Sequence, residues 1–210
     1  MRTAHFVAIL ALASLPAIAF AGKPKEADPL PQIVMTGISE FDGVFGKAKG
    51  IQDKLTAETT SLKTARANVN TALEVATDAP LETALADLLK KADKKVSVAL
   101  EGRMPKLKAA DAVPDNVQKG IDAVNGLVSA ADSSITTVTG LKSDAVALAE
   151  ECKAFPGKLP SLVKNPMEVM SKSKVLGDDV KATGALGDRL QLLIDEAGKI
   201  LTDVQSAFGA

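Results

Sequence analysis

The residues that most often carry out chemistry are scarce in this sequence. Its 210 residues include no Trp, no Tyr, one His and one Cys. The histidine, His5, lies so near the start that the processing expected below removes it. A chain without histidine has no Ser-His-Asp or Cys-His catalysis, no histidine-ligated zinc or haem, and no Glu-x-x-His di-iron site. The single cysteine permits no disulfide within the chain, so stability has to come from packing.

Residues 1–21 have the parts of a secretory signal peptide. Arg2 supplies a short positive region, and residues 6–15 (FVAILALASL) form the apolar run. Ala19 and Ala21 are the small residues that a signal peptidase selects. The run is too short to span a bilayer, which needs about 20 apolar residues. We therefore expect cleavage after Ala21 and a periplasmic or secreted protein.

The charges of the expected mature chain are nearly balanced. Without Arg2 it has 24 basic and 26 acidic residues, a net charge of −2. Proteins that bind nucleic acid usually present a concentrated basic face. The balance therefore argues against DNA or RNA as a partner.

Apolar residues recur at every seventh position after an extended, proline-rich arm at residues 22–32. This spacing is typical of a long helix that faces a core. We expect the first helix over residues 33–78, with a length of about 68 Å at 1.5 Å per residue. Its main column is Val34, Phe41, Ala48, Leu55, Leu62, Val69 and Ala76.

Three further helices are expected, over residues 80–103, 115–154 and 166–208. Pro80 and Pro114 are placed to open the first two, because proline is well tolerated in the first turn of a helix. The column of the third helix is Val117, Val124, Ala131, Val138, Ala145 and Cys152. The column of the fourth is Val169, Leu176, Leu190, Ala197 and Val204. We predict an all-α fold, an elongated antiparallel bundle of about four helices with coiled-coil-like heptad packing, as a single domain over residues 33–210.

A second column on the first helix contains only small, uncharged residues, where a solvated helix usually carries Lys or Glu. It consists of Gly43, Gly50, Ala57, Thr64 and Thr71. One interpretation is a contact face where the backbone of a partner, such as another copy of the chain, comes close. The other is a weak, bendable helix in solvent, because each glycine costs a helix about 0.8–1 kcal/mol relative to alanine.

The most basic part of the chain begins at residue 90. Its candidate contacts to an anionic envelope surface are Lys90, Lys91, Lys94, Lys95 and Arg103. Such a cluster attracts anionic lipid, lipopolysaccharide or peptidoglycan. The segment has no Trp, Tyr or Phe to anchor it at an interface, and nearby acids dilute its charge. A solvated helix face is the alternative interpretation, and any such contact is expected to be weak.

Two stretches resemble catalytic or reactive sites and are better explained as ordinary parts of a helix. In residues 141–152 (LKSDAVALAEEC), Cys152 belongs to an apolar column, so we expect a small buried side chain. The alternative for Cys152 is an intermolecular disulfide. Residues 171–174 (SKSK) match Ser-x-x-Lys, but the partner motifs Ser-Asp-Asn and Lys-Thr-Gly are absent. We therefore assign no catalytic residue, cofactor or metal site.

The sequence favours a non-enzymatic envelope protein that acts through its long surface. It would serve as a scaffold, spacer or partner-binding module, with another protein or a second copy as its partner. The alternative is a lipid- or membrane-associating bundle that opens like an exchangeable apolipoprotein and turns its apolar columns outward.

Overall fold

The protein is mostly helical. The computed structural model describes residues 30–93, 95–110 and 112–209, so the expected signal peptide lies outside the described residues. The described part has five helices and two strands. In chain order they are α1 (Ser39–Ala72), α2 (Leu81–Ala92), β1 (Val96–Glu101), β2 (Met104–Ala109), α3 (Asp115–Cys152), α4 (Phe155–Leu162) and α5 (Pro166–Ala207).

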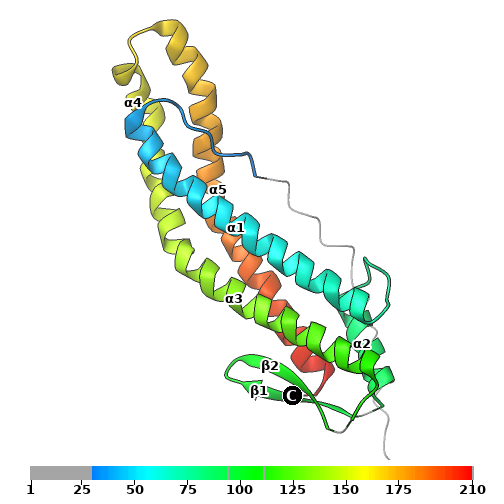
Figure 1. The fold of residues 1–210 in the computed structure, drawn as a ribbon. Coiled ribbons are helices and arrows are strands. Elements are labelled where there is room, and N and C mark those ends of the chain that lie inside the picture. The colour runs from blue at the N-terminus through cyan, green and yellow to red at the C-terminus, as the bar shows by residue number, and fades with distance from the viewer. Residues whose placement is uncertain (1–29, 94, 111, 210) are drawn as a thin grey trace, which may run out of the picture.

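Three long helices lie side by side and give the molecule an elongated shape (Figure 1). Along the chain, α1 and α5 run in one direction and α3 runs in the other. Both α1 and α5 contact α3. The short α4 lies at one end of the molecule, and α2 and the two strands lie at the other. None of the described helices has a stretch long and apolar enough to cross a membrane.

The columns predicted from seven-residue spacing lie in the core. Every member of the α3 column, from Val117 to Cys152, is at most 1% exposed. On α1, the column from Phe41 to Val69 is also buried. The two ends of that column are exceptions: Val34 precedes α1 and is 55% exposed, and Ala76 follows α1 and is also exposed. The burial of these side chains confirms the predicted register of both helices.

The first helix is shorter than the predicted range 33–78. Residues 30–38 form an extended arm that crosses the long helices (Figure 1). The Asp42 carboxylate accepts hydrogen bonds from the backbone N–H groups of Thr36 (2.7 Å) and Gly37 (3.0 Å). Gly37 has a φ of 75°, a left-handed conformation that a helix cannot contain. The helix therefore begins at Ser39 and not at residue 33.

Side chains of α1 and α5 hold the arm in place. Gln52 accepts a hydrogen bond from the Ile33 N–H (3.1 Å) and donates one to the Pro31 carbonyl (2.8 Å). The Asp179 carboxylate accepts from the Val34 N–H at 2.9 Å. Ile33 is 2% exposed, so the arm also adds to the core.

The prediction of a helix over residues 80–103 is wrong beyond Ala92. Asp93 has a left-handed φ of 45° and ends α2. Residues 96–109 then form an antiparallel hairpin that turns at Gly102, whose φ is 67°. The apolar residues Val96, Val98 and Leu100 alternate with period two, and this pattern outweighs the weak helical spacing. The fold is therefore not purely α-helical.

The hairpin is fastened to α3. The Leu107 side chain is 2% exposed. Asn125 of α3 accepts from the Leu107 N–H (2.8 Å) and donates to the Leu107 carbonyl (3.0 Å). At the turn, Arg103 forms an ion pair with Asp132 of α3 at 2.5 Å.

The segment between the third and fourth predicted helices is not simply a break. Most of it forms α4, which begins with Phe155 and Pro156, where proline is tolerated. The Phe155 ring stacks on Phe41 with ring centroids 4.4 Å apart and meets the edge of Phe45 at 5.6 Å. These contacts tie the α3–α4 turn to the start of α1. The neighbouring helices end at Cys152 and Ala207, two residues and one residue before their predicted ends.

Candidate interaction surface

The small-residue column of α1 lies on the outside of the protein. All five of its members, Gly43, Gly50, Ala57, Thr64 and Thr71, are exposed. A methyl group added at Gly43 or Gly50 would meet no packing neighbour within 4 Å. No described residue therefore packs closely against these two glycines.

Part of this column forms one wall of an open groove between α1 and α3. The groove has a volume of about 800 Å³. Its α1 wall consists of Ala57, Thr60, Ser61, Thr64, Ala65 and Asn68. Its α3 wall consists of Asp122, Ala123, Gly126 and Ala130. The ten side chains are small or polar, and Asp122 is the only charged one.

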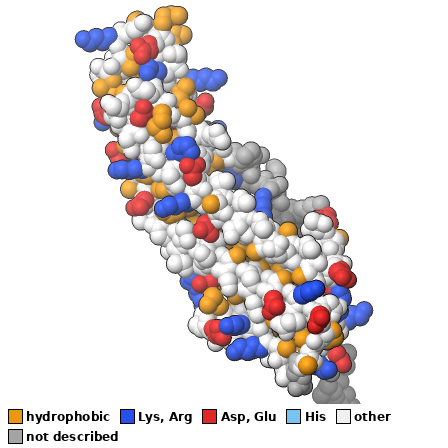
Figure 2. Space-filling model, in the orientation of Figure 1, with side chains coloured by type: hydrophobic (Ala, Val, Ile, Leu, Met, Phe, Trp, Pro, Cys, Tyr) orange, Lys and Arg blue, Asp and Glu red, His pale blue; other side chains and the backbone are white. Residues whose placement is uncertain are grey.

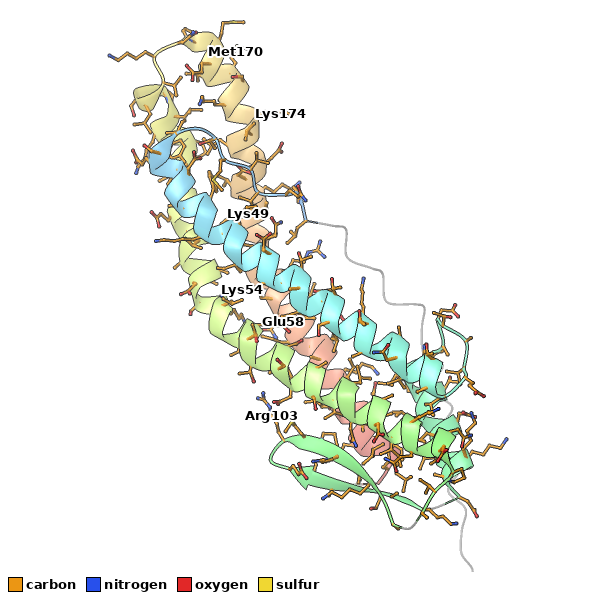
Figure 3. The ribbon with its side chains drawn as sticks, in the orientation of Figure 1. Lys49, Lys54, Glu58, Arg103, Met170 and Lys174 are labelled. Atoms are coloured by element: carbon orange, nitrogen blue, oxygen red, sulfur yellow. The ribbon has the colours of Figure 1, made fainter. Side chains whose placement is uncertain are left out.

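The core packing of α1 and α3 determines where the groove lies. Leu55, Leu62 and Val69 turn inward, so positions 57, 61, 64 and 68 fall on the outer side of the same helix. Glu58 is half-buried between the helices, and the Ser134 hydroxyl of α3 donates to its Oε2 at 2.8 Å. Figure 3 shows Glu58 on α1 at this seam. The two walls are thus joined beside the groove.

The α3 wall was missed in the sequence analysis. Gly126, Ser133, Gly140 and Ala147 are spaced by seven residues, and all four are exposed. This second column of small residues matches the one on α1, and Gly126 lines the groove. Figure 2 views the face formed by α1 and α3, and much of its middle is white, the colour of backbone and uncharged polar side chains. The same spacing test applied to residues 115–152 would have found this wall.

The groove provides a surface for contact and few groups that could take part in a reaction. Its charged group, Asp122, accepts a hydrogen bond from Gln118 at 2.9 Å. The described residues contain no group of three or more His, Cys, Asp or Glu side chains that could hold a metal ion. A trough with small walls suits the close approach of another backbone, as in helix-in-groove recognition.

A smaller hollow of about 400 Å³ lies at the α4 end, between the start of α1 and the start of α5. Its charged lining residues are Glu40, Lys164, Glu168 and Lys172. Because both signs are equally represented, the hollow does not select an anion or a cation.

The predicted basic residues lie near the opposite end. Lys91 forms an ion pair with Asp87 (2.8 Å) and donates to the Leu73 carbonyl (2.7 Å). Arg103 is held by Asp132. Lys90 and Lys95 are exposed, and Lys94 lies outside the described residues. Two of the five predicted contact residues, Lys91 and Arg103, therefore already form bonds within the fold.

Cys152 lies in a small buried polar cluster with two residues of α5. The side chains of Cys152 and Thr183 are fully buried, and Asp179 is 1% exposed. Burial raises the pKa of the Cys152 thiol to about 11, although the neighbouring Thr183 hydroxyl opposes the shift. Burial also raises the pKa of Asp179, against the effect of its hydrogen bond from Val34. The thiol is therefore protonated and enclosed, which is the opposite of a reactive cysteine.

Three of the buried polar residues lie at heptad spacing from apolar residues of the same helix. Thr183 lies between Leu176 and Leu190, and Ser134 lies between Leu127 and Leu141. Asp179 precedes Leu186 by seven residues. A polar residue at a core position of a heptad pattern was thus the signal that could have identified this cluster.

Comparisons with protein-family models, with curated proteins and with solved structures find no match to this chain. The candidate surface therefore has to be interpreted from its own geometry.

Proposed function

We propose that the protein is a non-enzymatic structural or partner-binding module of a bacterial-type cell envelope. In this proposal the long helices act as an elongated antiparallel bundle with heptad packing, and a helix of the partner lies in the α1/α3 groove. The partner is another protein or a second copy of the chain. The observation that carries the proposal is the groove, because two helices contribute small exposed side chains to the same trough.

The shape of the groove supports a helical occupant. Its α1 wall extends from Ala57 to Asn68, about 16 Å at 1.5 Å per residue, or three helical turns. Helices approach within about 8–10 Å of each other, and small side chains permit the shorter distances. Large or charged side chains on the walls would prevent such an approach.

The composition supports a role without catalysis. The described residues contain no histidine, and the one cysteine is enclosed. The features of residues 1–21 support export. With 42 residues, α5 is about 63 Å long, a length suited to a spacer.

Site-specific cross-linking in intact cells tests the groove. A photo-reactive amino acid replaces Thr64, which lines the groove, or Thr56, which is exposed on the same helix outside it. We expect a discrete cross-linked protein or dimer from position 64 and little from position 56. Equal yields at the two positions, or no protein product at position 64, would refute the proposal. Thr64→Glu should also abolish the product obtained from a probe at Gly126 in the opposite wall.

The alternative function is association with lipid. The form of this alternative that the sequence suggests is a bundle that opens and turns its core columns outward. One observation favours a lipid contact of some kind: large exposed apolar residues gather at the α4 end of the molecule. That contact requires no opening, and its argument follows.

A further inference from the structure

At the α4 end of the molecule, the start of α5 and the loop before it project beyond the start of α1 (Figure 1). We call residues 155–174 the tip. In Figure 1 the start of α5 extends past the start of α1, so α1 does not cover the first turns of α5. Figure 3 shows Met170 at this extremity and Lys174 one turn further along α5.

The tip carries the two most exposed large apolar side chains of the described chain, Met167 and Met170. Met167 is 76% exposed, Met170 is 74% exposed and Leu162 is 43% exposed. Met167 and Met170 are three residues apart on α5, so they lie on the same side of the helix. The other large exposed apolar residues lie elsewhere in the described chain and are less exposed than either methionine: Val34 and Met35 in the arm, Leu100 on β1, Val146 on α3 and Leu192 further along α5. A cluster of this kind marks an interaction site more often than scattered residues do.

The tip is also positively charged. It contains four lysines and one acid, Glu168, whereas the whole chain has a net charge of −1. Lys158 pairs with Glu40 of α1 at 2.8 Å, and Lys172 pairs with Glu168 at 3.4 Å. Within the described residues, Lys164 and Lys174 have no ion-pair partner. The apolar residues are thus accompanied by two uncompensated cations.

From this combination we infer that the tip docks onto an anionic lipid surface. Flexible methionine side chains enter the boundary between headgroups and acyl chains, and the lysine ammonium groups bind headgroup phosphates. An extremity can meet a flat surface without clashes from the rest of the molecule. The core columns stay closed, in contrast to an apolipoprotein-like opening. The inference is independent of the α1/α3 groove, which lies along the side of the molecule.

The site differs from the basic segment at residues 90–103, which lies at the opposite end. Among its described residues, that segment has two exposed lysines, Lys90 and Lys95, and one large exposed apolar residue, Leu100. Its lysine pair therefore provides a matched control of equal charge.

Co-flotation with vesicles tests the inference. The mature protein, without residues 1–21, is mixed at low salt with vesicles of phosphatidylcholine alone or with 30% phosphatidylglycerol. Removal of the apolar run at residues 6–15 ensures that it cannot carry the protein to the vesicles. We expect flotation with the anionic vesicles, weakened by high salt, and little with the neutral ones.

Three double variants locate the contact. Lys164→Gln/Lys174→Gln should lower the partition coefficient about 30-fold, since each lysine near an anionic surface contributes about fivefold. Met167→Ser/Met170→Ser should lower it more than tenfold. Lys90→Gln/Lys95→Gln should stay within about twofold of the wild type. All six side chains are exposed, so circular dichroism should show unchanged folding.

The opposite results would overturn the inference. If the wild type does not float with anionic vesicles, the tip is not a lipid-binding surface, and a protein captured at the tip would not rescue the claim. If the Lys90/Lys95 variant loses binding while both tip variants keep it, the contact lies at the other end. Thr64→Glu should float like the wild type, which separates this inference from the proposed groove.

Discussion

The Ser134 hydroxyl donates a hydrogen bond to Glu58 Oε2 at 2.8 Å and connects the middle of α3 to the middle of α1. Ser134 is fully buried, and Glu58 is half-buried beside the proposed groove. A charged acceptor makes this a stronger bond than one between neutral groups. The pair therefore sets the axial register of the two helices that form the groove.

Removing this hydroxyl should destabilise the protein. We expect Ser134→Ala to lower the free energy of unfolding by about 1.5–3 kcal/mol, because Glu58 loses a hydrogen-bond donor while remaining half-buried. Urea unfolding followed by circular dichroism measures the change. The control is Ser133→Ala at the neighbouring exposed position, which should change stability by less than about 0.5 kcal/mol. Equal values for the two variants would show that the Ser134–Glu58 bond contributes nothing.

Two glycines of α3 should respond in opposite ways to the same substitution. At Gly140 a methyl group would meet no packing neighbour within 4 Å, so Gly140→Ala should stabilise α3 by about 1 kcal/mol. At Gly120 the methyl carbon would lie 2.5 Å from Leu73 Cδ2 and 3.1 Å from Leu88 Cδ1. Overpacking costs about 1–3 kcal/mol, so Gly120→Ala should give a net loss of about 1 kcal/mol. A gain from both substitutions, in thermal melts of the two variants, would contradict this packing.

Asp179 should make the protein less stable at neutral pH. Its folded-state pKa is raised above the ordinary value of 3.8, chiefly by burial and further by the nearby charges of Asp178 and Asp42. The folded state therefore binds the proton more tightly than the unfolded state. The contribution of protonated Asp179 to the free energy of unfolding is fully present below pH 3.8. It is lost as the pH rises through the folded-state pKa.

The substitution Asp179→Asn should remove this pH-dependent loss. At pH 7 we expect an increase in the melting temperature of about 2–4 °C for each kcal/mol gained. At pH 3 the variant should differ little from the wild type. Asp178→Asn at the exposed neighbouring position is the control and should have a smaller effect at pH 7. A lower melting temperature for Asp179→Asn at pH 7 would contradict the prediction.

Cys152 should be unreactive in the folded protein. With its pKa raised to about 11, the thiolate fraction at pH 8 is about 100-fold smaller than for a thiol at its ordinary value of 9.0, and the side chain is enclosed. Alkylation by iodoacetamide should therefore be at least about 100-fold slower in buffer than in urea, as followed by mass spectrometry. Rapid alkylation in buffer, or a disulfide-linked dimer on non-reducing gels, would show that Cys152 is accessible.

Much of the helical architecture could be predicted because a long core column repeats without interruption. The α3 column, Val117 to Cys152, is buried as predicted. The spacing of apolar residues did not predict two other features, the hairpin and the arm. Residues 96–109 carry a weak helical pattern and a two-residue alternation, and the left-handed Asp93 decides between them. The arm at residues 30–38 is extended because Asp42 and Gln52 bind its backbone, and such contacts have no local sequence pattern.

The candidate surface was predictable on one helix only. Spacing identified Gly43, Gly50, Ala57, Thr64 and Thr71, and all five are exposed. It could not show that Ala57 and Thr64 face the same groove as Gly126, because that depends on how α1 and α3 are placed side by side. The tip was not predicted either. Met170 looks like an ordinary helix residue until the projection of α5 beyond α1 leaves it exposed.

The arm has a consequence for the order in which the protein matures. Val34 is fastened to Asp179, 145 residues later in the chain, so the earliest described segment cannot be attached until the last helix has been synthesised. Contacts of such long sequence separation form late, because the intervening chain has to be ordered first. Until then, the apolar Ile33 and the uncovered Asp179 remain accessible to chaperones and proteases. A truncation within α5 that removes Asp179 would therefore leave the arm at residues 30–38 without this attachment.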